Sequence, residues 1–214
     1  VVLITQGMID AGSGTMVLAS DTSYVLVADI SMNAPFYSVG NNVTFDGNDH
    51  KITMNNSAFT GLFKNSVAVH NLGILPGTST LVADAGWFFA KSTGGTATNC
   101  YSTGPIGQDG GGIFGRTSTG TAHNCYSMGD ISNNGGGIFG MYGNNVTATN
   151  CYSIGKIGAN GGGIFGKNCI VNAMNCYSTG LIGTNAGGIF GNGCTTITDI
   201  SSGFSVGWHD YIAN

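Results

Sequence analysis

The chain of 214 residues has no glutamate, only three prolines and very little charge. Charged residues make up 7% of it, against roughly 25% in an average soluble protein. The net charge is −4 and the six basic residues are scattered along the sequence, so no cationic stripe is expected and nucleic acid is excluded as a partner. No apolar run reaches about 18 residues, so no membrane-spanning helix is expected.

Good helix formers are also scarce, whereas glycine is the commonest residue, with 38 copies. Gly, Asn, Thr, Ser and Val together disfavour helices and suit short strands joined by many turns. The composition therefore predicts an all-β protein.

An internal repeat organises the chain. The segment TATNCYSTGPIGQDGGGIFG is followed by three similar segments, two ending in GGGIFG and one in AGGIFG. Weaker copies precede it, and successive units are 25 or 26 residues apart. Helix-poor units of this length are typical of the coils of a parallel β-solenoid. The prediction is a single domain over residues 1–214 with about seven coils: an N-terminal cap and first coil over 1–40, repeat coils over 41–198 and a C-terminal cap over 199–214.

Stacked coils should place equivalent residues in ladders about 4.8 Å apart. The first predicted ladder contains Phe63, Phe89, Phe114, Phe139, Phe165 and Phe190. The second contains Cys100, Cys125, Cys151 and Cys176. The third lies at a turn and contains Asp84, Asp109, Asn134, Asn160 and Asn185. Asn and Asp tolerate left-handed turn geometry, and the glycines that follow are expected to supply positive φ angles.

The hexapeptide GGGIFG also matches the glycine pattern of nucleotide-binding loops. Such a loop should occur once, between a strand and a helix, whereas these six letters occur three times in a helix-poor chain. The near match to a phosphate-binding loop at 161–168 has Asn168 where Ser or Thr should hold magnesium. We expect no nucleotide, and no other cofactor or metal.

The motifs NCYSTG and GGGIFG closely resemble the GLUG-motif repeat, and the resemblance covers about residues 24–200. It implies a right-handed parallel β-helix of the kind found in bacterial surface adhesins and in similar repeat proteins of large DNA viruses. The family has no shared catalytic residues to carry over to this chain.

Six cysteines leave two interpretations open. Stacked equivalents point the same way, a poor geometry for disulfides, so a column of buried free thiols is one. Bridges or a metal site are the other, although the chain has no C-x-x-C pair.

A tyrosine follows each repeat cysteine, and alternation along a strand should turn the tyrosines outward if the cysteines face inward. Stacked tyrosines could simply stabilise the sheet, or form a platform for sugar rings or a neighbouring subunit. Thr103, Met128, Ile154 and Thr179 should lie beside them. The candidate binding residues are Tyr101, Tyr126, Tyr152 and Tyr177.

Catalysis is not expected. Glycoside hydrolases need paired carboxylates, and the local charged cluster at 46–51 resembles a structural turn of the same repeat family. The sequence thus predicts a non-catalytic structural or adhesive protein of a virion surface, fibre or cell surface. It should form a homo-oligomer or pack on other structural proteins, with a glycan or host-surface ligand as a further partner. The alternative is a carbohydrate-binding module or a carbohydrate-active β-helix.

Overall fold

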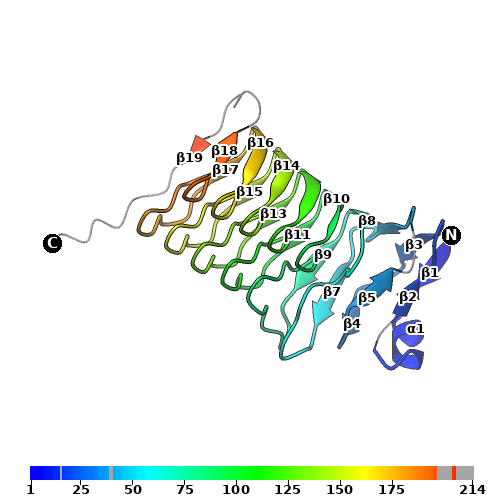
Figure 1. The fold of residues 1–214 in the computed structure, drawn as a ribbon. Helices are drawn as coiled ribbons and strands as arrows, with labels where there is room; N and C mark the ends of the chain where they lie inside the picture. Colours follow the sequence, from blue (N-terminus) through cyan, green and yellow to red (C-terminus); the bar gives the residue numbers. More distant parts are fainter. Residues whose placement is uncertain (15, 39–40, 197–203, 206–214) are drawn as a thin grey trace.

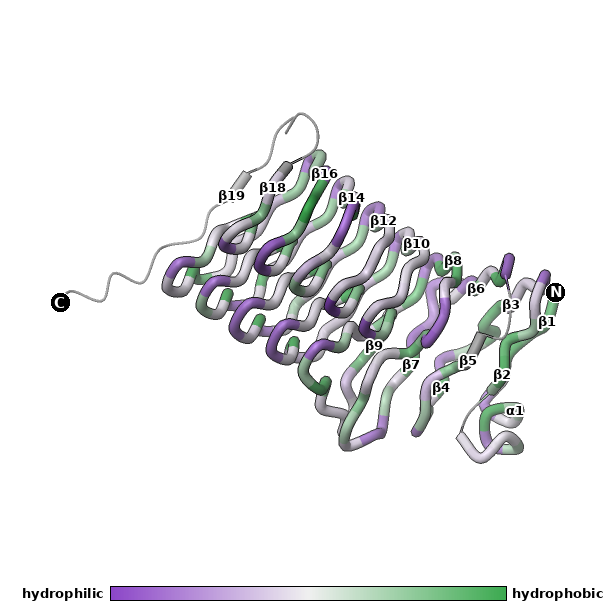
Figure 2. Tube along the Cα trace, viewed as in Figure 1, coloured by the Kyte–Doolittle hydropathy of each residue, from purple (hydrophilic) through white to green (hydrophobic). Residues whose placement is uncertain are grey.

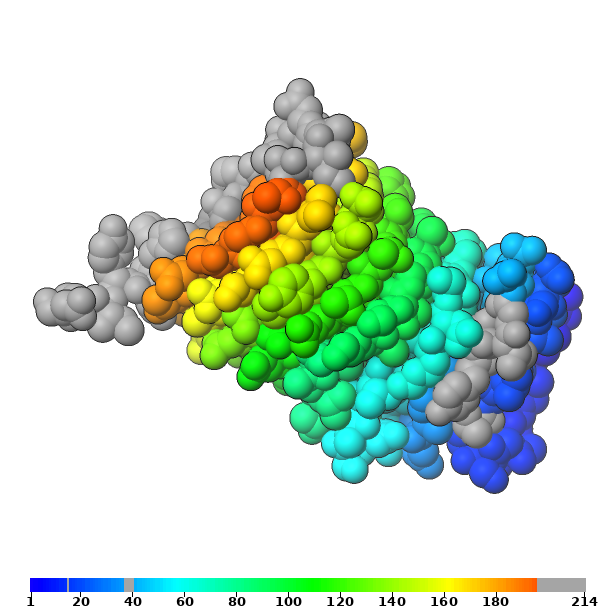
Figure 3. Space-filling view, viewed as in Figure 1, coloured from blue at the N-terminus to red at the C-terminus, as the bar shows by residue number. Residues whose placement is uncertain are grey.

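The computed structural model describes residues 1–14, 16–38, 41–196 and 204–205. Parallel strands stack into a β-solenoid of about seven turns, which confirms the predicted fold class (Figure 1). Successive coils form neighbouring bands along the rod in the space-filling view (Figure 3). The expected C-terminal cap, with Trp208, His209 and Tyr211, lies outside the described residues apart from one short strand at 204–205.

Two long parallel sheets form two faces of the rod, and each contains one strand from successive coils. The nine-stranded sheet contains, in order, β1 (Val2–Ile4), β3 (Ser23–Leu26), β6 (Thr44–Asp46), β8 (Val67–His70), β10 (Gly94–Thr98), β12 (Thr119–His123), β14 (Asn144–Thr149), β16 (Ile170–Met174) and β18 (Thr195–Thr196). The eight-stranded sheet contains β4 (Ile30–Met32), β7 (Lys51–Met54), β9 (Gly73–Leu75), β11 (Tyr101–Ser102), β13 (Tyr126–Ser127), β15 (Tyr152–Ser153), β17 (Tyr177–Ser178) and β19 (Phe204–Ser205). A two-stranded sheet of β2 (Met16–Leu18) and β5 (Phe36–Ser38) lies near the N-terminus.

The strand register follows the sequence repeat. Ala97 pairs with Ala122, which pairs with Ala148, so equivalent residues lie side by side. The unit from Cys125 to Cys151 has 26 residues, one more than the units on either side of it, and the ladder between β14 and β16 shifts register between Asn144 and Val146. Asn145 has a φ of 54°, and it absorbs the insertion as a local bulge.

Phenylalanine rings form a continuous row in the core, outside the two long sheets. Bridges link Phe63 to Phe89 and onward through Phe190, and the rings of Phe89 and Phe114 stack with centroids 4.5 Å apart. The row begins one coil earlier than the repeat indicated, at Phe36, which bridges to Phe63. Its sequence context lacks the glycine motif, so the pattern alone gave no signal.

The turn before the glycine motif corrects one expectation. Asp109, Asn134 and Asn160 have φ angles of 58–59°, as predicted for this ladder. The prediction that the following glycines also adopt positive φ is wrong, because no glycine of the three GGGIFG copies does so. Glycine is required here because a side chain has no room. A Cβ on Gly112 would lie 2.0 Å from the carbonyl oxygen of Gly137 in the next coil.

A short helix, α1 (Gln6–Ala11), lies at the N-terminal end of the rod and was not predicted (Figure 1). Ile9 is the buried residue of this helix. The Gln6 side-chain amide donates to the backbone oxygen of Ser31 and accepts from its backbone N–H, in the edge strand β4. The Gln6 side chain therefore occupies hydrogen-bonding groups that a further strand would otherwise pair with.

Candidate functional site

The tyrosines occupy equivalent positions on β11, β13, β15 and β17. Ring centroids of Tyr101, Tyr126, Tyr152 and Tyr177 are 4.9, 4.8 and 5.0 Å apart in succession, with interplanar angles of 2–6°. Each inner ring therefore has a neighbour on both faces. The ring of Tyr101 also lies against Gly73, where a Cβ would come within 2.4 Å of it. The column turns ring edges and hydroxyl groups outward and covers both faces of the inner rings, whereas Tyr177 at its end is 40% exposed.

Two further columns follow the tyrosines along the chain, and the second of these lies past a bend at Gly104, Gly129, Gly155 and Gly180. The residues two positions after the tyrosines are Thr103, Met128, Ile154 and Thr179, and those four positions after them are Pro105, Asp130, Lys156 and Leu181. Met128, Ile154 and Leu181 are 45, 42 and 41% exposed, which is high for such side chains. We call these twelve residues the tyrosine face. It contains one acid and one base, on adjacent coils, and the Lys156 backbone N–H donates to Asp130 Oδ1 at 2.9 Å.

Serines lie on the opposite side of the same strands, facing the core. Ser102, Ser127 and Ser153 are fully buried, and their hydroxyl groups have no hydrogen-bond partner among the described residues. A Cβ on Gly112 would lie 2.7 Å from the Ser127 Cβ, so this wall of the core accepts only small side chains. Serine here is a small residue in a tight space, a role that the sequence pattern did not reveal.

The repeat cysteines form a buried column of free thiols. The Cys125 thiol donates to the carbonyl oxygens of Ala97 and His123 at 3.4 and 3.3 Å. Burial raises the pKa of Cys125, and the pKa of Cys151 is raised by its hydrogen bond with Cys125 together with burial. The thiols of Cys125 and Cys151 are therefore held in the unreactive protonated form.

The remaining two cysteines, Cys169 and Cys194, are free thiols at equivalent positions on neighbouring coils. Cys169 is buried, and its hydrogen bond with Cys194 raises its pKa. Cys194 is partly exposed, and the same hydrogen bond lowers its pKa despite burial. Of the six thiols, Cys194 is the one placed to react.

Charged groups gather at one corner, although the sequence showed the basic residues as scattered. Lys91, Arg116 and Lys167 each follow the phenylalanine row by two residues. Asp84 contacts Lys91 at 2.8 Å and Arg116 at 3.3 Å. Burial alone would raise the pKa of Asp84, but these hydrogen bonds outweigh it and hold the pKa below its usual range. The Arg116 guanidinium also lies 5.2 Å from the ring centre of Tyr142.

The acidic turn at 46–51 is built from structural hydrogen bonds. Asp46 Oδ1 accepts from the backbone of Asn48 and from the Asn71 side chain one coil later. His50 Nδ1 lies 3.2 Å from Asp29 Oδ1, and the Lys51 backbone N–H lowers the Asp29 pKa by donating to the same carboxylate. The groups of this cluster hold adjacent coils together.

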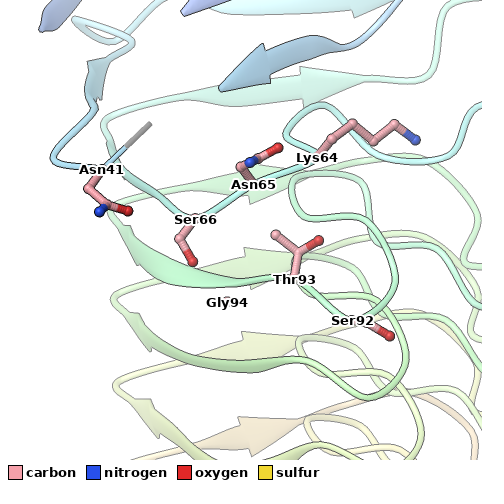
Figure 4. A pocket seen from close by; sticks show the side chains of 7 residues that line it. All are labelled: Asn41, Lys64, Asn65, Ser66, Ser92, Thr93 and Gly94. Carbon is pink, nitrogen blue, oxygen red and sulfur yellow. The ribbon is translucent and has the colours of Figure 1, made fainter. Parts of the chain in front are cut away.

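A shallow pocket of about 510 Å³ opens near β8 and β10 (Figure 4). The Lys64 side chain points out of the pocket. It runs away from Ser66 and Thr93, and its ammonium group donates to Thr60 (Figure 4). Burial lowers the Lys64 pKa. The remaining groups are neutral amides and hydroxyls. The lining residues are Asn41, Lys64, Asn65, Ser66, Ser92, Thr93 and Gly94.

Within the described part of the chain, no group of three or more His, Cys, Asp or Glu side chains is placed to hold a metal ion. In the same part, no helix is long and apolar enough to cross a membrane.

Comparisons with known proteins give a fold relationship. No family model and no curated protein matches the chain. A solved structure, that of a protein described as a putative immunoglobulin A1 protease from Bacteroides ovatus, superposes with a TM-score of 0.52 at 20% sequence identity. The match covers 88% of this chain and 71% of the other. At this identity the similarity shows a shared β-helix fold, and the GLUG resemblance stays an interpretation of the motifs.

Proposed function

We propose that this protein is a non-catalytic structural or adhesive β-helix that acts through its tyrosine face, on a virion, fibre or cell surface. The observation that carries the proposal is the chemistry of that face. The sheet presents half-exposed Met128 and Ile154 between the tyrosine edges and a mixed column that contains one acid and one base. Aromatic residues and methionine with a polar rim are typical of protein interfaces, and few charges must be desolvated on contact.

The stacking of the tyrosines favours a protein partner over a sugar. Sugar rings pack on open aromatic faces, whereas the inner rings here cover one another at 4.8–5.0 Å. The hydroxyl edges can still donate and accept hydrogen bonds. Repetition at each coil lets weak contacts add along the rod.

The aspartates support a structural role. Six of the ten accept hydrogen bonds that close a turn or join coils: Asp21, Asp29, Asp46, Asp84, Asp109 and Asp130. A catalytic carboxylate pair would need two acids that face substrate across a gap of roughly 5–9.5 Å. These acids are instead engaged at corners and turns.

The test is a turnover assay on the purified chain. Pectin, alginate, xylan and immunoglobulin A1 are incubated with stoichiometric protein for a day and examined for unsaturated sugars, reducing ends and peptide cleavage. We expect no product above a heat-unfolded control. Product whose yield rises with protein concentration would overturn the non-catalytic proposal and make the acid-lined corners the next target for mutation.

A further inference from the structure

The dipeptide Asn-Gly occurs three times in the chain, at Asn134–Gly135, Asn160–Gly161 and Asn192–Gly193. This pair is chemically labile, because the glycine nitrogen has no side chain beside it and can attack the side-chain carbonyl carbon of the preceding asparagine. By sequence alone the three pairs are equivalent. The fold separates them, because it buries and hydrogen-bonds the attacking nitrogen in two pairs and exposes it in the third.

The first two pairs lie in the turn that opens the glycine motif. Gly135 and Gly161 are both buried. The Gly135 N–H donates to the backbone oxygen of Ser132 at 3.1 Å, and the Gly161 N–H donates to that of Gly158 at the same distance. A nitrogen held in this way is not free to attack, so these pairs should react only when the coil opens locally.

The third pair lies directly before β18, the last strand of the nine-stranded sheet (Figure 1). Asn192 and Gly193 are both exposed. They occupy the two central positions of a turn that is closed by the bond from the Cys194 N–H to the backbone oxygen of Gly191, at 3.3 Å. Gly193 has a φ of 74°, as the third residue of a type II turn requires.

The backbone nitrogen of Gly193 has no hydrogen-bond acceptor in the part of the chain that the structure describes. The equivalent nitrogens of earlier coils each donate to an oxygen of the next coil. Tyr142 donates to the backbone oxygen of Lys167, and Asn168 donates to that of Asn192, both at 2.9 Å. No described coil follows β18 in this sheet, so Gly193 lacks such an oxygen. Its nitrogen is therefore exposed and free beside the Asn192 side chain.

We infer that Asn192 is a site of spontaneous modification, at which the Gly193 nitrogen displaces the side-chain amide and converts the asparagine to aspartate or isoaspartate. The Gly193 nitrogen gives its proton to water and bonds to Cγ of Asn192, and the bond from Cγ to Nδ2 breaks. The amide nitrogen leaves as ammonia, and a five-membered succinimide ring remains. Water then adds to either ring carbonyl and opens the ring. Nothing is oxidised or reduced, and water is the one co-reactant.

The reaction adds a negative charge to a column of residues that carries cations. Asn192 is equivalent to Lys91, Arg116 and Lys167, two residues after the phenylalanine row. Lys167 lies one coil earlier and takes part in none of the ion pairs of the described residues. A carboxylate at position 192 would lie about one coil spacing, roughly 4.8 Å, from the Lys167 backbone, within reach of its ammonium group. This inference goes beyond the proposed function and does not depend on it.

The test follows all three pairs in one sample of the folded chain. The chain is kept in mildly alkaline buffer for several weeks, samples are digested under acidic conditions, and mass spectrometry measures conversion at each pair. Asn192 should convert at least about tenfold faster than Asn134 or Asn160, the factor expected when one backbone hydrogen bond must break first. In the chain unfolded by guanidinium the three rates should converge, because the reacting dipeptide is the same.

Two variants tie the modification to these atoms. Asn192→Gln should abolish the acidic species that anion exchange resolves, because the longer side chain would have to close a six-membered ring. Asn65→Gln is the matched control, since Asn65 is exposed at the equivalent position of an earlier coil but precedes Ser66. It should leave the acidic species unchanged. Isoaspartate should accompany aspartate in the product, because direct hydrolysis of the side-chain amide would give aspartate alone.

Equal rates at the three pairs of the folded chain would overturn this inference, and so would a product that contains aspartate without isoaspartate. Neither result would touch the proposed function, whose failure is read from turnover. Conversely, turnover by a chain that converts Asn192 as described would overturn the proposed function and leave the modification site standing.

Discussion

The Nδ2 of Asn124 donates to the Oδ1 of Asn99, one coil earlier, at 3.1 Å. The same bond continues from Asn150 to Asn124 and from Asn175 to Asn150, each at 3.1 Å. All of these asparagines have φ between 52° and 54°. The asparagine of each NCY motif therefore serves twice, in a left-handed turn and in a ladder of amides along the rod. The sequence repeat contains this asparagine in each copy of the motif, but its spacing alone does not reveal the ladder of amide hydrogen bonds.

Substituting Asn124 separates these two roles. Asn124→Gly should lose the amide bonds but keep the turn, whereas Asn124→Ala should also strain the left-handed backbone. We expect the alanine variant to lower the free energy of unfolding by about 2–3 kcal/mol and the glycine variant by about 1 kcal/mol less, from hydrogen-bond and left-handed-backbone costs. Urea unfolding monitored by circular dichroism measures both. Equal losses would show that the turn carries no strain.

Close approach, and not backbone freedom, explains the glycine motif. Gly112→Ala should therefore destabilise the protein by about 3 kcal/mol, since the new Cβ would lie 2.0 Å from a backbone oxygen that cannot move without breaking the ladder. Gly7→Ala is the matched control in α1, where the nearest atom is 3.8 Å away. It should stabilise by about 0.5–1 kcal/mol through helix propensity. Thermal unfolding of the two variants should shift in opposite directions, and a mild effect of Gly112→Ala would contradict the packing argument.

The corner carboxylate predicts a pH dependence. Because ion pairing with Lys91 and Arg116 lowers the Asp84 pKa in the folded state, the stabilisation is present above the unfolded pKa, near pH 4. This stabilisation is lost as pH falls through the pKa that Asp84 has in the folded protein. Asp84→Asn should cost about 0.5–1 kcal/mol at pH 7, and the gap to the unsubstituted chain should close as pH falls below the folded-state pKa of Asp84. Asp49→Asn, at an exposed turn position outside the described ion pairs, should leave the profile unchanged.

Thiol reactivity separates Cys194 from the other cysteines. With Ellman's reagent at pH 8 we expect one thiol per native chain to react quickly and five to react only on unfolding, because five are buried and Cys194 is partly exposed with a lowered pKa. Cys194→Ser should remove the fast phase. Rapid labelling of several thiols would contradict the inward orientation of the cysteine column.

The sequence by itself determined the fold. Equivalent Cys, Tyr and Phe residues recur at 25 or 26 residues, and only a parallel stack of coils brings such residues into contact at every repeat. Alternation also predicted that Cys and Tyr face opposite sides of each strand, and the structure shows that the cysteines are the buried ones. Hydrophilic residues recur at one corner of successive coils, as the periodicity requires (Figure 2).

The tertiary structure alone decided what each surface can do. Side-chain rotamers and the coil spacing set the tyrosine rings face to face, so that the inner rings cover one another. The approach of one coil to the next made Gly112 a requirement of space, and the corner geometry brought Asp84 between Lys91 and Arg116. Periodicity specifies which residues are neighbours. Distances and orientations between neighbours depend on the packing of the whole coil, which no single repeat contains.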